Sequence, residues 1–325
     1  MLDRLLTPGT PTLTPETLAD RAGVDREFSN RLWRAIGFPD LPENVPVFTE
    51  EGLDALRNIT GGLNSLLPTD EDPEEALVRQ VRAICAGLSR IAEVLSDGIA
   101  ASITTARQVG MSEQEIASLL VDGLDWERIS NLTDYALRLQ VRAAVRRKCS
   151  VENEPTSDLS VGFLDLVGYT AISQELDSVD LDNLIVRFDA LTRDSVAELG
   201  GRVVKTIGDE VMYVADDPHV AVEIALRLTE RTAGDDQLPE ARAGVDLGAA
   251  VTRDGDYYGP AVNLAHRLVE VARPGTVLVS GSVHHAVIDN PEFAWSRMRV
   301  RRIRDIGRIE TFSVRSGDRS TTVHQ

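Results

Sequence analysis

Two aspartates in the second half of the chain have surroundings that suit a hard metal cation. Asp165 lies within the apolar run VGFLDLVGYT at residues 161–170, which favours a strand. A carboxylate inside a buried strand is costly unless it is paired or holds a metal. Asp209 lies in the segment GGRVVKTIGDEVMYV at residues 200–214. If the first strand lies beside this segment, the two carboxylates meet, and with phosphate oxygens they suit a pair of Mg²⁺ or Mn²⁺ ions.

Segment 200–214 is expected to form a hairpin, with strands at 202–206 and 211–214 and Gly208 in the turn. Lys205, Asp209 and Glu210 then stand at or near the turn. A hairpin backbone fixes a carboxylate firmly, which favours cation binding. A surface hairpin with solvated charges is the alternative for a segment of this composition.

A third segment, DYYGPAVNLAHR at residues 256–267, supplies an amide and a guanidinium. Pro260 favours the first turn of a helix, which places Asn263 and Arg267 four residues apart on one face. Aimed together into a cleft, these two side chains can hold ribose and phosphate oxygens.

The three segments together resemble the class III nucleotide cyclases. The motifs F-x-D-x-x-G-[FY]-T, K-x-x-G-D and D-x-x-G-x-x-V-N-x-x-x-R occur here in the family's order. The matching residues are Phe163, Asp165, Gly168, Tyr169, Thr170, Lys205, Gly208, Asp209, Asp256, Gly259, Val262, Asn263 and Arg267. The resemblance covers residues 157–314, and three ordered motifs are far more specific than a single glycine motif.

The resemblance implies a reaction and gives the motif residues their roles. In the family the ribose 3′-oxygen attacks the α-phosphorus in line, and pyrophosphate leaves. Asp165 and Asp209 are therefore expected to hold two divalent metal ions, Mg²⁺ or Mn²⁺, as cofactors. Asn263 is expected to orient the ribose, and Arg267 to stabilise the charge that develops on the α-phosphoryl group.

The resemblance also assigns Lys205 and Asp256 to the base. A lysine donates to N1 of adenine and an aspartate accepts from its 6-amino group, whereas guanine reverses this pattern. The pair predicts ATP as substrate and hence an adenylyl cyclase, a lyase that makes 3′,5′-cyclic AMP. A guanylyl cyclase and an inactive nucleotide sensor are the alternatives, although inactive relatives usually lose a metal aspartate or the Asn and Arg pair.

An obligate homodimer follows from the same resemblance. In the family the two metal carboxylates come from one subunit, and the base-reading and Asn/Arg residues come from the other. Because this chain carries both sets, two copies are expected to form two equivalent sites. His266, beside the Asn/Arg pair, is expected to pack or to face solvent; a pH-responsive role near the site is the alternative.

The elements around these residues alternate between strand and helix. Helices are expected at about 181–199 and 219–232 and after Pro260, with strands at 242–251 and 276–280, then a short helix and a terminal hairpin. The order β-α-β-β-α-β predicts a ferredoxin-like α+β core with helices over one face of its sheet, within a catalytic domain at residues 151–325.

Composition excludes several other classes of protein. The chain has 325 residues, 42% of them hydrophobic and 26% charged, which suits a globular protein with two domains. A net charge of −18 argues against broad binding of nucleic acid. Because no apolar run reaches transmembrane length and no signal peptide is visible, a cytoplasmic protein with Cys85 and Cys149 as reduced thiols is expected.

Residues 1–150 are expected to form an all-α domain. Apolar residues recur at helical spacing in segments 51–66, 73–95 and 126–148, and Ser112 and Glu115 form a capping-box pattern. Residues 14–38 also resemble a helix-turn-helix, so a DNA-binding regulator is an alternative, but a small helical packing unit fits the acidic chain better. The apolar faces can pack internally, dimerise, or hold a lipid or other small molecule.

The helical half resembles, less specifically, the regulatory domains of some soluble actinobacterial adenylyl cyclases. That resemblance implies autoinhibition and pH sensing. Residues 1–150 contain no histidine, however, so a response near neutral pH would need a catalytic-domain histidine, a carboxylate with a raised pKa, or the nucleotide. The polar segment 146–158 separates the halves near Val151, and a helix rotation there is expected to alter the dimer.

Overall fold

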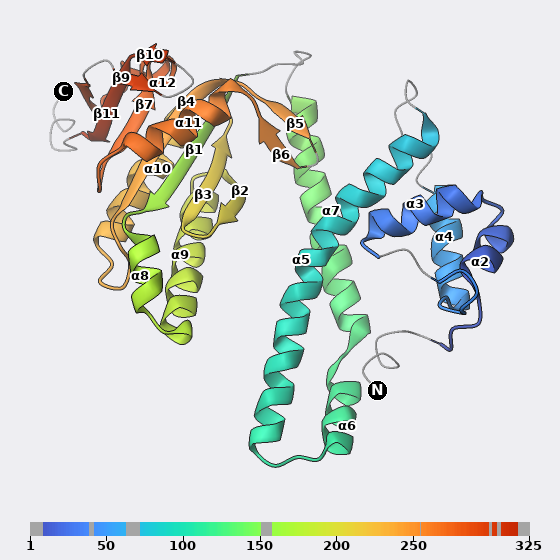
Figure 1. Cartoon of the computed structure of the whole chain (residues 1–325). Coiled ribbons are helices and arrows are strands. Elements are labelled where there is room, and N and C mark those ends of the chain that lie inside the picture. Colours follow the sequence, from blue (N-terminus) through green and yellow to red (C-terminus); the bar gives the residue numbers. More distant parts are fainter. Residues whose placement is uncertain are drawn as a thin grey trace. The chain divides into compact units, whose positions relative to one another are not determined.

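The structure, a computed structural model, describes residues 9–38, 42–62, 72–150, 158–253, 255–298, 301–303 and 307–317 (Figure 1). The chain divides into two compact units, Met1–Ala144 and Val145–Gln325. The division falls inside α7 (Trp126–Ser150), a few residues before the boundary expected near Val151, which lies outside the described residues.

The first unit is helical in its described part, as the sequence predicts. Its helices are α2 (Pro15–Ala22), α3 (Arg26–Ile36), α4 (Glu50–Gly62), α5 (Pro73–Gln108), α6 (Glu113–Gly123) and the first part of α7. The capping box at the start of α6 is present, because Ser112 accepts from the Glu115 N–H and Glu115 accepts from the Ser112 N–H. The end of the helix expected at 51–66 lies outside the described residues.

The core of this unit explains why residues 14–38 fold as two short helices. Phe28 and Leu32 of α3 are buried against Leu53 of α4 and Leu77 of α5. The helix-turn-helix pattern therefore places its apolar face inside the helical core, as a packing unit requires.

Internal packing accounts for only part of the apolar residues on the two long helices. Leu77 and Val81 of α5 are buried, but Ile84, Leu88 and Ile91 are 43–48% exposed. On α7, Leu132, Tyr135, Leu137, Leu139 and Val141 are all exposed. No described helix is both long and apolar enough to cross a membrane.

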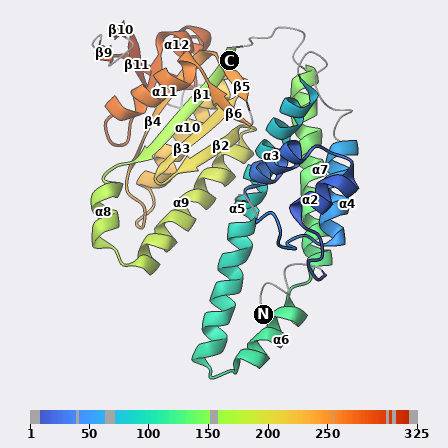
Figure 2. The same cartoon turned by 45° about the vertical axis from the view of Figure 1, so that its right-hand side comes forward.

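The second unit contains the predicted β-α-β-β-α-β core (Figure 2). Its elements are β1 (Asp158–Leu166), α8 (Tyr169–Glu175) with α9 (Ser178–Glu198), β2 (Arg202–Ile207), β3 (Glu210–Ala215), α10 (Pro218–Ala233) and β4 (Ala241–Ala249). The strands lie in the order β2-β3-β1-β4 and each pair is antiparallel. This arrangement is the ferredoxin-like sheet.

Later elements extend the sheet and add two short hairpins. They are β5 (Val251–Arg253), β6 (Asp256–Tyr258), α11 (Pro260–Val271), β7 (Val277–Ser280), α12 (Gly281–Val287), β8 (Phe293–Arg297), β9 (Arg301–Ile303), β10 (Gly307–Ile309) and β11 (Thr311–Ser316). Strand β7 pairs parallel to β4, and β11 and β8 follow it, which makes a seven-stranded sheet. Strands β5 and β6 form one two-stranded sheet apart from it, and β9 and β10 form another.

The helices of the β-α-β-β-α-β core cover one face of the sheet, as expected, and the later helix α11 covers the other face. Leu164 of β1 and Tyr213 of β3 pack on the side of α9, α10 and α12. Phe163 and Met212, their neighbours along the same strands, pack against α11 on the other side. Because successive side chains of a strand point to opposite faces, α11 covers the face that the prediction left open.

Candidate active site

The carboxylates of Asp165 and Asp209 lie together at one end of β1. The turn between β2 and β3 carries Asp209, and its carbonyl accepts from the Leu166 N–H at 3.3 Å. Burial raises the pKa of Asp209 to about 6, and a hydrogen bond with Asp165 and repulsion from its charge add to the rise. Two carboxylates in contact in a partly buried place are chemically suited to a divalent cation, which would relieve their repulsion.

An arginine that the sequence did not single out holds Asp165. Arg242 of β4 lies directly across from Asp165 in the β1–β4 pairing. Its Nε and Nη2 both donate to Asp165 Oδ2, at 2.8 and 2.6 Å, and its Nη1 donates to the carbonyl oxygen of Glu270 at 3.1 Å. The sequence contains no local signal for this contact, because it depends on a strand register set by residues far apart in the chain.

Lys205 and Asp256 meet at a second place. The Lys205 Nζ donates to Asp256 Oδ2 at 2.5 Å, although the two residues lie on β2 and on the separate β6. Burial alone would raise the pKa of Asp256, but hydrogen bonds from Lys205 and from the Tyr257 N–H and the charge of Lys205 lower it overall. Asp256 therefore stays ionised near neutral pH and can accept hydrogen bonds.

Asn263 and Arg267 lie on α11, on the side of the helix away from the sheet. Ala261 and Ala265 of α11 are buried against the sheet, whereas Asn263 is exposed. Arg267 follows Asn263 by four residues and its Nη1 donates to Glu270 Oε2 at 2.8 Å. By helix geometry Asn263 and Arg267 face away from the sheet. The two aspartates belong to the sheet, which packs against the opposite side of α11.

His266 contacts the neighbourhood of the aspartates. Its ring packs edge-on against Phe163 with 5.3 Å between the ring centroids, and its Nε2 lies 3.4 Å from Glu210 Oε2. Burial raises the pKa of Glu210, and the charge of His266 opposes that rise. The packing contact with Phe163 agrees with the expected packing role of His266.

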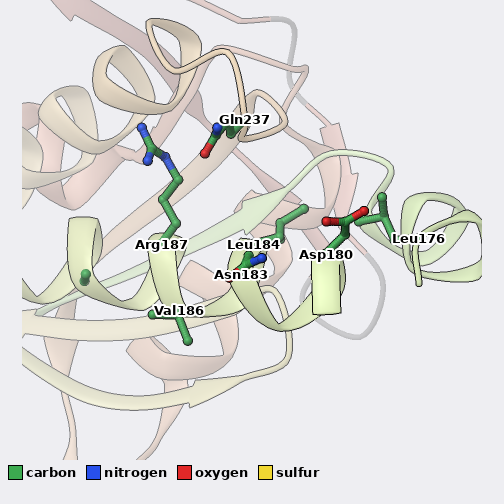
Figure 3. Close-up of a pocket in the computed structure, with 8 residues that line it drawn as sticks. Leu176, Asp180, Asn183, Leu184, Val186, Arg187 and Gln237 are labelled. Carbon is green, nitrogen blue, oxygen red and sulfur yellow. The ribbon is translucent and has the colours of Figure 1, made fainter. Parts of the chain in front are cut away.

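Other features of the described residues lie away from these groups. Among the residues that the structure describes, no group of three or more His, Cys, Asp or Glu side chains is arranged to hold a metal by itself. A pocket of about 630 Å³ lies along α9, where Asp180, Arg187 and Gln237 are among the lining residues (Figure 3). None of the six predicted site residues lines it.

Comparisons with a family model and with individual proteins point to the same protein family. Residues 151–316 match the family described as the adenylate and guanylate cyclase catalytic domain. An adenylate cyclase of Streptomyces coelicolor is 37% identical over 82% of this chain and 69% of its own length. An adenylate cyclase of Glutamicibacter nicotianae is 32% identical over 98% of this chain and 82% of its own length. A pH-sensitive adenylate cyclase of Mycobacterium tuberculosis is 34% identical over 92% of this chain and 77% of its own length.

Proposed function

Because this chain belongs to the adenylate and guanylate cyclase family, we propose that it converts ATP to 3′,5′-cyclic AMP and pyrophosphate. The observation that carries the choice of ATP is the contact between Lys205 and Asp256. A cationic donor beside an ionised acceptor matches N1 and the 6-amino group of adenine, and it presents the wrong pattern to guanine.

Asp165 and Asp209 would hold the metal ions of the reaction. Two carboxylates in contact, with the pKa of one raised to about 6, fit divalent cations such as Mg²⁺ or Mn²⁺. Phosphate oxygens and water would complete the ligand sets, since the described residues provide no third acidic or histidine ligand. When bound, the cations supply Lewis-acid activation of the ribose 3′-oxygen and neutralise phosphate charge.

The remaining residues would position the substrate and stabilise charge. Asn263 would bind the ribose and fix the direction from which its 3′-oxygen approaches the α-phosphorus. Arg267 would donate to the oxygens of the α-phosphoryl group, where negative charge develops in the transition state. Arg242 donates two hydrogen bonds to Asp165 and would hold that carboxylate in place.

The outward position of Asn263 and Arg267 supports an active homodimer. Within one chain these two side chains face away from the sheet that carries Asp165 and Asp209. Two copies related by two-fold symmetry would bring the pair of one chain to the aspartates of the other. Each dimer would then contain two equivalent sites.

A mixing experiment tests the shared site. D165A and N263A should each lose about 10²-fold or more of the cyclase activity with ATP, since each removes a group that acts at the reacting atoms. In a random mixture of the two chains, half of the dimers are mixed and each mixed dimer has one intact site. Co-expression should therefore restore about a quarter of the wild-type rate.

The assay should follow cyclic AMP from ATP and cyclic GMP from GTP, with Mg²⁺ and with Mn²⁺. Two different affinity tags verify that mixed dimers have formed. If verified mixed dimers stay inactive, the shared site is wrong. If the wild-type protein prefers GTP, the assignment of Lys205 and Asp256 to adenine is wrong, and if it turns over neither nucleotide, the sensor alternative replaces the enzyme.

We also propose that the helical unit regulates the cyclase. The matched relatives cover the helical half as well as the catalytic half, and one of them is described as pH-sensitive. Helix α7 ends at Ser150, and residues 151–157 lead from it to β1 of the catalytic domain, so a regulatory signal carried along the chain would pass through α7. A lipid or other small molecule as the ligand of the helical unit remains a hypothesis of the sequence alone.

A further inference from the structure

Asp256 stands on a hairpin that does not belong to the main sheet. Among the described strands, β5 and β6 pair only with each other, and the hairpin leads directly into α11. Its base is held tightly: Gly259 has φ of 140°, and a Cβ there would approach the Ala249 carbonyl oxygen to 2.9 Å. Asp256 lies at the other end of the hairpin, near its turn. This end needs a separate attachment if Asp256 is to stay at a fixed distance from Lys205 of β2.

An irregularity in β2 provides a second attachment point next to Lys205. The pairing of β2 with β3 shifts between Val203 and Lys205, so that Arg202 lies opposite Val214 and Lys205 opposite Met212. Residues three apart on a regular strand point to opposite faces. Here Val214 and Met212 both pack toward α11, so the bulge turns Arg202 and Lys205 to the same face.

Arg202 uses this orientation to hold the neighbour of Asp256. Its Nη2 donates to the phenol oxygen of Tyr257, and its guanidinium carbon lies 5.1 Å from the centroid of the Tyr257 ring. The ring also packs against the cluster formed by β1, β3 and α11. Arg202 Nε is buried and has no hydrogen-bond partner among the described residues, so the Tyr257 contact is the main polar attachment of this guanidinium.

We propose that Arg202 and Tyr257 are positioning residues that set the distance between Lys205 and Asp256 for recognition of the base. The inference rests on the proposed role of the Lys205–Asp256 pair in reading adenine. Two contacts then join β2 to β6 side by side: Lys205 with Asp256, which meets the substrate, and Arg202 with Tyr257, which does not. When ATP enters and draws Lys205 and Asp256 toward its base, the second contact keeps the hairpin in place.

The proposal predicts a change in substrate binding without a change in the chemical step. Base contacts are equal in the ground state and the transition state, so weakening them raises KM and leaves kcat nearly unchanged. In the full-length enzyme, Y257F removes the phenol oxygen and keeps the ring. We expect KM for ATP to rise about 3- to 10-fold, kcat to stay within about 2-fold, and the preference for ATP over GTP to fall by about the KM factor.

Variants of Arg202 test whether both residues act through one contact. R202M should match or exceed the effect of Y257F, and the double variant R202M/Y257F should be no worse than R202M. R202K should fall between the wild type and R202M, because an ammonium can still donate to the phenol oxygen and lie on the ring. Additive losses in the double variant would overturn a shared contact.

Y213F is the matched control for a loss of stability. The Tyr213 hydroxyl donates to the Ala221 carbonyl oxygen at 2.9 Å in the buried core, away from the hairpin. Y213F should lower Tm and leave KM and the nucleotide preference unchanged. If Y257F lowers Tm and kcat without raising KM, its role is structural and the proposal is wrong.

Two further variants separate this inference from the proposed function. K205A and D256A should abolish the preference for ATP over GTP. If they keep that preference, base recognition by this pair is wrong and the inference fails with it. If they lose it while Y257F and R202M keep wild-type KM and preference, base recognition stands and only the positioning role is refuted.

Discussion

His284 of α12 is a buried ionisable residue outside the active site, and its surroundings favour the neutral ring. The ring stacks on Phe312 with the centroids 3.6 Å apart, it is 8% exposed, and its Nδ1 has no hydrogen-bond partner among the described residues. Burial and the nearby His285 lower the pKa of His284, which Glu310 only partly offsets.

This lowered pKa predicts a loss of stability in acid. Below the ordinary histidine pKa of about 6.5, His284 of the unfolded chain binds a proton. In the folded chain the same residue binds it only when the pH falls to the lowered pKa of the buried ring. The free energy of unfolding should therefore decrease as the pH falls from about 7.5 to 5.5. His284 should contribute to this decrease, and the contribution is seen as a lower Tm at acidic pH.

The measurement is Tm against pH for the wild type, H284F and H285Q. H284F keeps an aromatic ring against Phe312 and should reduce the decrease in Tm at acidic pH. Any packing cost of the substitution should lower Tm equally at every pH and leave this difference unaffected. His285 is exposed, so H285Q should retain most of the decrease. Equal pH dependence in all three proteins would assign the acid sensitivity to other groups.

At the residue scale, some contacts could be predicted from the sequence. These are the contacts that follow from the residue types within a local motif. A carboxylate within an apolar strand predicted that Asp165 would have a polar partner, and the structure places Asp209 there. The contact of Arg242 with Asp165 was missed, and so was that of Arg202 with Tyr257. Both depend on strand pairing or on a bulge, which a single sequence does not specify.

At the scale of elements, α11 shows how close packing positions the Asn/Arg pair. A Cβ on Gly244 of β4 would lie 2.5 Å from the Ala265 carbonyl oxygen and 2.5 Å from the Val269 nitrogen, both in the helix backbone. No methyl group fits there unless the helix moves. The strand therefore allows α11 to approach closely, and this approach fixes the height of Asn263 above the sheet.

G244A tests this role of the glycine. The added methyl group should displace α11 and destabilise the fold by about 1–3 kcal/mol. Cyclase activity should fall about 10²-fold, since a displacement of about 1 Å at a positioning group can cost that much. The readouts are Tm and kcat with ATP.

Gly248 offers a control on the same strand and under the same helix. A Cβ there would meet the Ala261 Cβ at 3.6 Å, an ordinary contact. G248A should therefore keep nearly wild-type Tm and activity. If G244A is equally well tolerated, the close approach of α11 does not position the Asn/Arg pair.

The elements themselves were largely predictable, because their signals are local. The β2–β3 hairpin, α10 and α11 lie within a few residues of their expected bounds. The helix on the second face, α11, lies beyond the predicted core, and β1 contains a sequence signal for it. Val161, Phe163, Leu164 and Leu166 are buried on alternating sides, and an apolar run without alternation indicates a strand buried on both faces.

At the scale of the whole molecule, the helical unit has more apolar surface than its own core covers. Ile84, Leu88 and Ile91 of α5 and Leu132 and Leu139 of α7 are exposed. The spacing of Ile84, Leu88 and Ile91 by four and three residues predicted one apolar face on α5, and the structure leaves these three side chains of that face exposed. The spacing could not show what covers that face, because periodicity gives the direction of a side chain and not its partner.

The connection between the two units permits a test of regulation. If the helical unit inhibits the cyclase, the fragment 151–325 should be several-fold more active with ATP than the full chain at one or more pH values between acidic and alkaline. A short glycine insertion within residues 151–157 should act like the deletion, because a flexible linker cannot transmit a rotation of α7. An inserted helix-forming segment of equal length is the control, since it is stiffer than glycine and should retain more of the regulation.

The full chain, the fragment and the two insertion variants are compared by cyclic AMP formation across the pH range, with dimer formation checked for each. The glycine and helical insertions differ in stiffness and not in length, so a difference between them isolates mechanical coupling from simple separation. If both insertions behave as the full chain does, α7 does not transmit the signal. If the fragment is no more active than the full chain at any pH, the helical unit is not an inhibitor, and its exposed apolar faces must serve another role.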